Sequence, residues 1–482
     1  MSTLPFHEQR RVSLWGVRNA TGNHDVSASL ADDSLALPRA LHEVDAAFMT
    51  QVLRRSGAIA ATNRVVSQTE QGVGMTAGYF SSIKKVRCTY SEATDAPTDF
   101  VVKAWPSLEI APRDSIAAMF LKDIHGYKIP AEQFYPRPKV HLAAFDPSQD
   151  AYVLVMEDAG VFASQKVHEH ELTFEEVMRM IPALVDVAVT WEGADEGERA
   201  AELAAMGIPH WTSPENLDGF KAGMPGGARL FDLVCCMRGT PINDGRPWDT
   251  RLGVPDFASR LTTRLDAFFA PVRPENGATC TIAHGDMRGD NIFFCEARSD
   301  HPHGWLCIDF QQMVRGPVSS DLAYLMNSGS VLPEVYAAEN QHRVLRAFYD
   351  QFMGKTRRYP EYSYHRFVDE YRRMATLQYI YYVAFGAAIF RAGAFENDLG
   401  MRVELGGRGA AEADLPPEQV RQRMWWSKAV PNFAETFKAF DLVELLATLP
   451  ENHDGLGPWG ELPEHLQQAS AGFNPSDPGT RP

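Results

Sequence analysis

The hydrophobic pattern of the chain changes near residue 157, and this change constrains the fold more than any other feature. Before it, five strand-prone segments rich in Val, Ile, Phe and Thr surround one helical segment, in the order 63–68, 80–90, 99–105, helix 115–127, 139–145 and 152–156. After it, helical patterns dominate, at 173–191, 256–269, 319–328, 340–353, 361–390 and 418–447. We therefore expect an α+β fold in which a small N-terminal lobe precedes a larger, mostly helical C-terminal lobe.

Polar and Gly-rich or Pro-rich stretches mark both ends of the chain. Residues 1–40 mix Asn, Gly, Ser and Asp without periodicity, and residues 451–482 are rich in Pro, Gly and polar side chains. We expect both segments to be loosely ordered, because neither offers enough apolar surface to bury. The N-terminal lobe is then expected at 41–157 and the C-terminal lobe at 158–450.

Two short signals fix helix ends within these lobes. An amphipathic pattern at 41–55 is followed by Gly57, which is typical of a helix C-terminus. Thr173 and Glu176 have the spacing of a capping box, so a helix should begin immediately after Thr173.

Composition limits the partners of the chain. Its 482 residues are 45% hydrophobic and 22% charged, which is enough for a sizeable core, and its formal net charge is −16. That charge repels polyanions, so we expect neither nucleic acid nor an anionic membrane as a partner. We expect a small ligand or a protein instead. Six cysteines without a CxxC pair favour a reducing compartment. The N-terminus has no apolar signal segment and the longest apolar run, 379–390, is too short to cross a bilayer, so we expect a cytosolic protein.

A polar cluster between apolar segments carries the chemistry. The residues at 284–291 are His-Gly-Asp-Met-Arg-Gly-Asp-Asn, and two β-prone segments lie beside them, at 291–295 and 304–310. If these segments pair as a hairpin, Asp286, Asn291 and Asp309 meet at one edge. Their oxygen atoms suit Mg2+ shared with the phosphates of a ligand. An Asp followed five positions later by Asn, and then by a second Asp on a neighbouring strand, is the arrangement used in kinase phosphoryl transfer.

This cluster also resembles a known family. Together with the segments 308–311, 316–317 and 321–325, it is similar to the aminoglycoside phosphotransferase and choline kinase superfamily, and within it to the ecdysteroid-kinase-like branch. The stretch 72–90 is similar to the nucleotide loop and following strand of that branch. The resemblance extends from about residue 60 to about residue 330. It implies a bilobal protein-kinase-like fold, with ATP and Mg2+ as cofactors and a hydroxylated small molecule as phosphoryl acceptor.

The resemblance assigns roles to five side chains. Asp286 accepts the proton of the acceptor hydroxyl, while Asn291 and Asp309 hold Mg2+. Lys103 lies in an apolar strand and would bind the α- and β-phosphates, although a lone lysine there is by itself more typical of a solvated sheet edge. Relatives steady this lysine with a helix glutamate, and Asp123 occupies that position here.

Two further segments are assigned to the nucleotide. Backbone amides of a glycine-rich loop, with hydroxyl groups at its end, would cradle phosphates at Gly72, Gly74, Gly78, Ser81 and Ser82. Backbone groups of the hinge between lobes would hold adenine at Met156, Glu157 and Asp158. Read without the resemblance, the first segment is more typical of a hairpin turn, and the second is equally well a strand that ends in a charged turn.

Other polar and aromatic residues keep structural interpretations beside functional ones. His284 is expected to support the loop, and Asp321 to anchor it from a helix start. Arg288 either contacts phosphate or forms a salt bridge within the loop. The aromatic residues at 379–385, with Trp211, Trp425 and Trp426, are either helix core or the wall of an acceptor pocket. The acidic residues between 396 and 414 are either solvated or attract a cationic substrate.

Two alternative functions remain at this stage. The Asp at position 123 and the long terminal segments outside the resemblance leave open a nucleotide-binding pseudokinase or scaffold that transfers no phosphate. A protein acceptor is less consistent with the sequence, because no activation segment ending in Ala-Pro-Glu follows Asp309.

Overall fold

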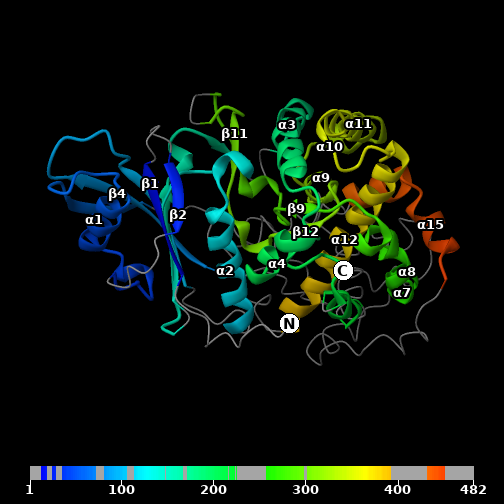
Figure 1. Cartoon of the computed structure of the whole chain (residues 1–482), viewed down its shortest axis with the longest axis horizontal. Helices are drawn as coiled ribbons and strands as arrows, with labels where there is room; N and C mark the ends of the chain where they lie inside the picture. Colours follow the sequence, from blue (N-terminus) through cyan, green and yellow to red (C-terminus); the bar gives the residue numbers. More distant parts are fainter. Residues whose placement is uncertain are drawn as a thin grey trace, which may run out of the picture.

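In the computed structural model, the protein divides into a sheet-rich lobe and a helical lobe, at the left and right of Figure 1. The structure describes residues 12–18, 24–28, 35–71, 81–105, 113–146, 148–166, 171–214, 216–222, 224, 257–297, 301–391 and 431–450. The expected α+β fold, with a small antiparallel sheet and helix before a larger helical lobe, is confirmed.

One sheet forms the centre of the N-terminal lobe. Its strands lie in the order β2-β1-β6-β7-β5-β4-β3, and every neighbouring pair is antiparallel. They are β1 (Val12–Arg18), β2 (His24–Ala28), β3 (Val65–Gln71), β4 (Ser82–Tyr90), β5 (Asp99–Ala104), β6 (Val140–Asp146) and β7 (Ala151–Glu157). The last five agree with the strands expected from the sequence.

Strands β1 and β2 differ from the expectation that residues 1–40 are loosely ordered. Strand β1 pairs with β6 from Val12 opposite Phe145 to Trp15 opposite Leu142, and β2 pairs with β1. Backbone groups on the free edge of β6 need hydrogen-bond partners, and β1 supplies them. Composition alone does not reveal such pairing, because it depends on a strand more than a hundred residues away.

Two helices cover opposite faces of this sheet. Helix α1 (Ala46–Arg55) begins later than residue 41 because Asp45 caps it, accepting the N–H of Phe48 at 2.8 Å. Its buried residues share a core with Val153 and Val155 of β7, while Tyr152 and Leu154 belong to the core on the side of helix α2 (Arg113–Lys128). This alternation along β7 follows from the two-residue period of a strand.

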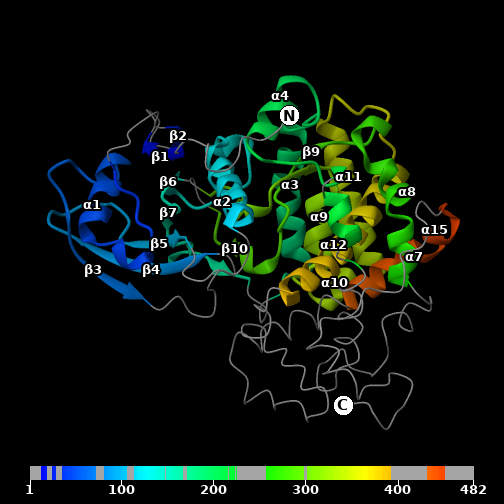
Figure 2. The same ribbon diagram turned by 90° about the horizontal axis from the view of Figure 1, so that it is seen from below.

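Helices form most of the C-terminal lobe. They are α3 (Phe174–Thr190), α4 (Gly197–Ala205), α7 (Phe257–Thr263), α8 (Leu265–Phe269), α9 (Ser320–Asn327), α10 (Pro333–Tyr336), α11 (Ala338–Lys355), α12 (Tyr364–Arg391) and α15 (Leu442–Thr448). The expected capping box is present at the start of α3, where Thr173 and Glu176 exchange hydrogen bonds. Helix α11 packs beside α3, and α12 beside α9 (Figure 2). None of the helices in the described residues is long and apolar enough to cross a membrane.

Short strands form two small sheets in the C-terminal lobe. The expected hairpin is present: β10 (Ile292–Phe294) pairs antiparallel with β11 (Trp305–Cys307), and β8 (Ser164–Gln165) adds a third strand. A second pair, β9 (Thr281–Ala283) with β12 (Val314–Gly316), was not expected. Three residues are too few to show a strand period in sequence.

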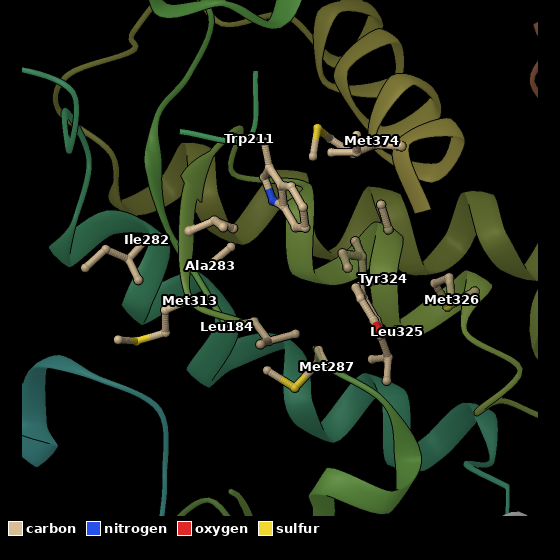
Figure 3. Packing of buried hydrophobic residues seen from close by; sticks show 14 of the residues in the cluster. Leu184, Trp211, Ile282, Ala283, Met287, Met313, Tyr324, Leu325, Met326 and Met374 are labelled. Carbon is tan, nitrogen blue, oxygen red and sulfur yellow. The ribbon is translucent and has the colours of Figure 1, made fainter. Parts of the chain in front are cut away.

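The core of the C-terminal lobe surrounds these short strands. Figure 3 shows Leu184 of α3, Tyr324 of α9 and Met374 of α12 packed around β9 and the loop that follows it, which contributes Met287. The polar loop at 284–291 is therefore held by a rigid apolar core.

Candidate active site

Lys103 lies between two carboxylates at the junction of the lobes. Phe100 and Val102 of β5 face α1, so the strand alternation turns Lys103 towards α2. Its Nζ lies 3.0 Å from Asp123 Oδ2 and 3.0 Å from Asp309 Oδ1, and only 6% of its side chain is exposed. Burial by itself would lower the pKa of Lys103, but the two carboxylates outweigh it and raise the pKa, so the ammonium stays charged. The expected Lys103–Asp123 pair is present.

Asp123 connects α2 to both sides of the site. Its Oδ2 accepts hydrogen bonds from Lys103 and, at 2.7 Å, from the Tyr152 hydroxyl, while its Oδ1 accepts the backbone N–H of Phe310 at 2.8 Å. Burial raises the pKa of Asp123, and these donors oppose that rise. A shorter carboxylate suffices here because helix α2 lies very close to Phe310. Gly126 of α2 permits this approach, since a methyl group there would overlap the Phe310 side chain.

Asp309 adopts a left-handed backbone conformation, with φ of 73° and ψ of 72°. Residues other than glycine occupy this region at a cost of about 1–3 kcal/mol, which is most often found at functional sites. The turn ends the strand before Asp309 and directs its carboxylate to Lys103. Burial favours the neutral acid, yet the Lys103 ammonium outweighs burial and holds the pKa of Asp309 below its ordinary value. Asp309 is therefore ionised near neutral pH.

Asp286 is held by three neighbours. Asn291 Nδ2 donates to its Oδ2 at 3.0 Å, the Tyr324 hydroxyl donates to its Oδ1 at 2.5 Å, and Arg288 Nε lies 3.6 Å from Oδ1. Burial raises the pKa of Asp286, while Arg288 and the Tyr324 hydroxyl oppose the rise. Arg288 also lies 3.0 Å from the Asp290 carboxylate, so the structure contains the loop salt bridge.

Backbone contacts fix the loop that carries Asp286. Asp321 accepts the N–H groups of His284 at 2.9 Å and Gly285 at 3.1 Å, and also the Tyr135 hydroxyl. His284 Nε2 lies 3.0 Å from the Ile308 carbonyl oxygen, and its Nδ1 accepts the N–H of Asp286 at 3.2 Å. These partners assign the proton to Nε2. His284 and Asp321 thus occupy the supporting positions expected from the sequence.

The donor set suits a magnesium ion shared with phosphates. Asn291 uses its amide nitrogen on Asp286, which leaves the amide oxygen for a cation, and 27% of the Asp309 side chain is exposed. Mg2+ is commonly held by one or two protein oxygens together with phosphates and water. The described residues contain no group of three or more His, Cys, Asp or Glu side chains that could hold a metal ion alone. Asn291 and Asp309 could therefore supply two of the oxygen ligands of an ion whose remaining ligands are phosphate and water oxygens.

The nucleotide assignments have different outcomes. Gly72, Gly74 and Gly78 lie outside the described residues. Ser81 is buried, and Ser82 begins β4 opposite Ala104, one position along the ladder from Lys103. The two hydroxyl-bearing residues therefore lie at the strand end next to the lysine.

The hinge residues are already engaged within the protein. The Glu157 N–H donates to the Lys139 carbonyl at 2.9 Å, and the Asp158 N–H donates to the Asp99 carbonyl at 3.0 Å. The Met156 side chain is buried in the core. The sequence predicts that backbone groups of these three residues hold adenine, and the sheet uses two of their N–H groups. Carbonyl groups or the following residues would have to contact the base.

The sequence analysis did not predict the tyrosines that support the site. Hydroxyl groups of Tyr135, Tyr152 and Tyr324 each reach a buried aspartate. Tyr324 had one signal, since it lies three residues after Asp321 and hence on the same helix face. The other two approach from distant segments and carry no local signal.

Part of the suggested acceptor wall does lie near Asp286. The rings of Trp211 and Tyr381 meet edge to face with centroids 6.5 Å apart. Burial and the nearby Asp286 raise the pKa of Tyr381, and Arg288 opposes them. Trp425, Trp426 and the acidic residues between 396 and 414 lie outside the described residues.

Comparison with known families finds a match in the C-terminal lobe. Residues 250–360 match the ecdysteroid kinase-like family. This segment contains Asp286, Asn291 and Asp309, and the match confirms the resemblance stated from these motifs. It does not include the stretch 72–90. A search of curated protein sequences found no significant match.

Several solved structures are similar at low identity. A GDP complex of an aminoglycoside 2′-phosphotransferase-IIIa variant has 13% identity and a TM-score of 0.40, covering 73% of this chain and 96% of that one. Choline kinase LicA from Streptococcus pneumoniae has 12% identity and a TM-score of 0.36, with 80% and 99% covered. An aminoglycoside phosphotransferase from Streptomyces rimosus, bound to ADP and streptomycin, has 16% identity and a TM-score of 0.31, with 68% and 97% covered. At these values no substrate can be transferred to this chain.

Proposed function

We propose that this chain, which matches the ecdysteroid kinase-like family over residues 250–360, is a small-molecule kinase that transfers the γ-phosphoryl group of ATP to a hydroxyl group. The observation that carries the proposal is the buried Lys103, placed between Asp123 and Asp309 and facing the loop of Asp286 and Asn291. A purely structural core rarely contains so many ionised groups, because the burial of each charge costs free energy. Phosphoryl transfer uses all of them.

Each residue has a definite task in this reaction. Lys103 pairs with the α- and β-phosphates, while Asn291 and Asp309 hold Mg2+, which neutralises charge on the phosphate oxygens. Asp286 orients the acceptor hydroxyl towards the γ-phosphate and takes its proton. The raised pKa of Asp286 suits this role, since a carboxylate that is less acidic is a better proton acceptor. Positioning and charge neutralisation then supply most of the rate enhancement.

The pseudokinase alternative loses its main support. It rested on the Asp at position 123, which is shorter than the glutamate of relatives. In the structure Asp123 reaches Lys103 at 3.0 Å and also the Phe310 N–H, so the shorter side chain leaves the arrangement complete.

Transfer from labelled nucleotide tests the proposal. The purified protein, Mg2+ and a small-molecule extract are incubated with γ-labelled ATP, and in parallel with γ-labelled GTP. Asp286→Asn removes the proton acceptor. Asp350→Asn is the matched control, because Asp350 is an exposed carboxylate paired with Arg346 on α11.

We expect label on a small molecule with the wild type and Asp350→Asn, and at least a hundredfold less with Asp286→Asn. Equal transfer by Asp286→Asn would exclude Asp286 as the base. Binding of Mg-ATP without transfer to the extract or to water would instead favour the scaffold. Label from GTP alone would change the donor and leave the site unaltered.

A further inference from the structure

We infer that Tyr324 is a positioning residue, which fixes the orientation of the Asp286 carboxylate for phosphoryl transfer. This inference rests on the proposed function. Tyr324 lies on α9, is 3% exposed, and donates its hydroxyl hydrogen bond to Asp286 Oδ1 at 2.5 Å. A hydrogen bond to an ionised acceptor is shorter and about twice as strong as one between neutral groups.

Helix α9 holds three consecutive residues of the loop through one face. Asp321, in its first turn, accepts the N–H groups of His284 and Gly285. Tyr324, three positions later, contacts the side chain of the next residue, Asp286. Residues three apart lie side by side on a helix, so the backbone and the carboxylate are held by the same rigid element. The position of α9 therefore sets the position of the base.

Each carboxylate oxygen of Asp286 accepts a hydrogen bond from a different residue. Asn291 Nδ2 donates to Oδ2 and Tyr324 donates to Oδ1, which fixes the plane of the carboxylate about its last torsion. Each carboxylate oxygen has a second lone pair, so one remains for the acceptor hydroxyl. Catalytic groups need to be held within about 10–20° of the productive orientation. Without Tyr324, Oδ1 would lose its 2.5 Å hydrogen bond, and Arg288 Nε at 3.6 Å would hold the carboxylate less firmly.

The ring of Tyr324 has a separate, structural task. It belongs to the same buried cluster as Leu184 and Met287, as Figure 3 shows. Tyr324→Phe keeps this packing and removes only the hydroxyl, so it separates the two tasks. Tyr349→Phe is the matched control, because its hydroxyl donates to the Tyr362 carbonyl at 2.7 Å and contacts no residue of the site.

Transfer kinetics provide the first test, with γ-labelled ATP and the acceptor isolated from the extract. We expect Tyr324→Phe to lower kcat about ten- to hundredfold, with KM for ATP within about twofold of the wild-type value. A residue that only maintains packing would not separate kcat from KM in this way. Tyr349→Phe should keep the wild-type kcat. Unchanged kcat in Tyr324→Phe, or a change confined to KM, overturns the inference.

A double-mutant cycle in unfolding tests the contact without any activity. Urea midpoints are measured for the wild type, Tyr324→Phe, Asp286→Ala and the double variant. We expect Tyr324→Phe to shift the midpoint less when Asp286 is already Ala, because its partner is gone. Additive shifts contradict the contact and with it the inference. If the shifts are coupled but the wild type transfers no phosphate, the contact between Tyr324 and Asp286 is supported and the proposed function is rejected. The positioning role is then rejected as well, because it depends on that function.

Discussion

Glu370 provides a test of burial that does not depend on function. It lies on α12 with 1% of its surface exposed, and it accepts hydrogen bonds from the Thr279 N–H at 3.2 Å, the Thr279 hydroxyl at 2.6 Å and the Tyr362 hydroxyl at 2.6 Å. Burial raises the pKa of Glu370 to about 7, although these donors and Arg366 act in the opposite direction. The carboxyl group joins α12 to the segment that leads into β9.

The sign and size of the effect follow from linkage. In the unfolded chain the pKa of Glu370 is near its ordinary value of 4.5. Between the two values the folded protein keeps a proton that the unfolded chain has lost, so the free energy of unfolding falls as pH rises. The contribution is complete below pH 4.5 and is lost as pH rises through 7. At about 1.4 kcal/mol per pH unit, the loss is roughly 3 kcal/mol.

Glu370→Gln isolates this contribution, because glutamine has nearly the same volume and does not titrate. The free energies of unfolding of wild type and variant are measured in urea from about pH 4.5 to about pH 8, and their difference cancels all other titrating groups. We expect wild-type stability relative to the variant to fall by roughly 3 kcal/mol over this range. Glu339→Gln, at an exposed position of α11, should show no such fall. A difference that does not change with pH would refute the reasoning, since it would mean that the donors keep Glu370 ionised.

Three further predictions concern the catalytic loop, a helix cap and the site. Gly285→Ala should lower the free energy of unfolding by at least about 2 kcal/mol in urea, because φ is +77° and a methyl group would overlap the Gln312 carbonyl oxygen. Thr173→Ala should lower it by about 1 kcal/mol in the same assay, because it removes the capping box of α3. Asp309→Asn should reduce transfer from labelled ATP at least a hundredfold while the thermal midpoint stays within a few degrees, since Lys103 retains Asp123. Near-normal transfer would contradict the assignment of Asp309.

The sequence predicted the features whose signals are local. The strands from β3 to β7 and the capping box at Thr173 each depend on neighbours in the chain, and the structure has them where expected. The hairpin of β10 and β11 was predictable because it joins two nearby apolar segments. The pairing of β1 with β6, and of β9 with β12, joins segments that are far apart in the chain. The hydrophobic pattern of the sequence therefore did not indicate it.

The site shows the same limit at the level of single side chains. Its charged residues were expected from the resemblance to a known family, and the structure brings Lys103, Asp123 and Asp309 together. The hydroxyl groups of Tyr135 and Tyr152 were not expected, since any residue that fills the space and donates to a buried carboxylate would serve. The hinge stays a prediction: Glu157 and Asp158 follow β7 as expected, and the sheet uses their N–H groups, which no local signal in the sequence indicated.

Asp123 shows why a departure from a family pattern has to be judged with its surroundings. Taken alone, the loss of one methylene moves the carboxylate away from Lys103. In the structure the loss coincides with a glycine one turn later, Gly126, which lets α2 lie directly against Phe310. The closer helix returns the carboxylate to within 3.0 Å of Lys103 and lets its other oxygen accept the Phe310 N–H. The short side chain and the close approach of α2 to Phe310 therefore act together in placing the Asp123 carboxylate between Lys103 and the Phe310 N–H.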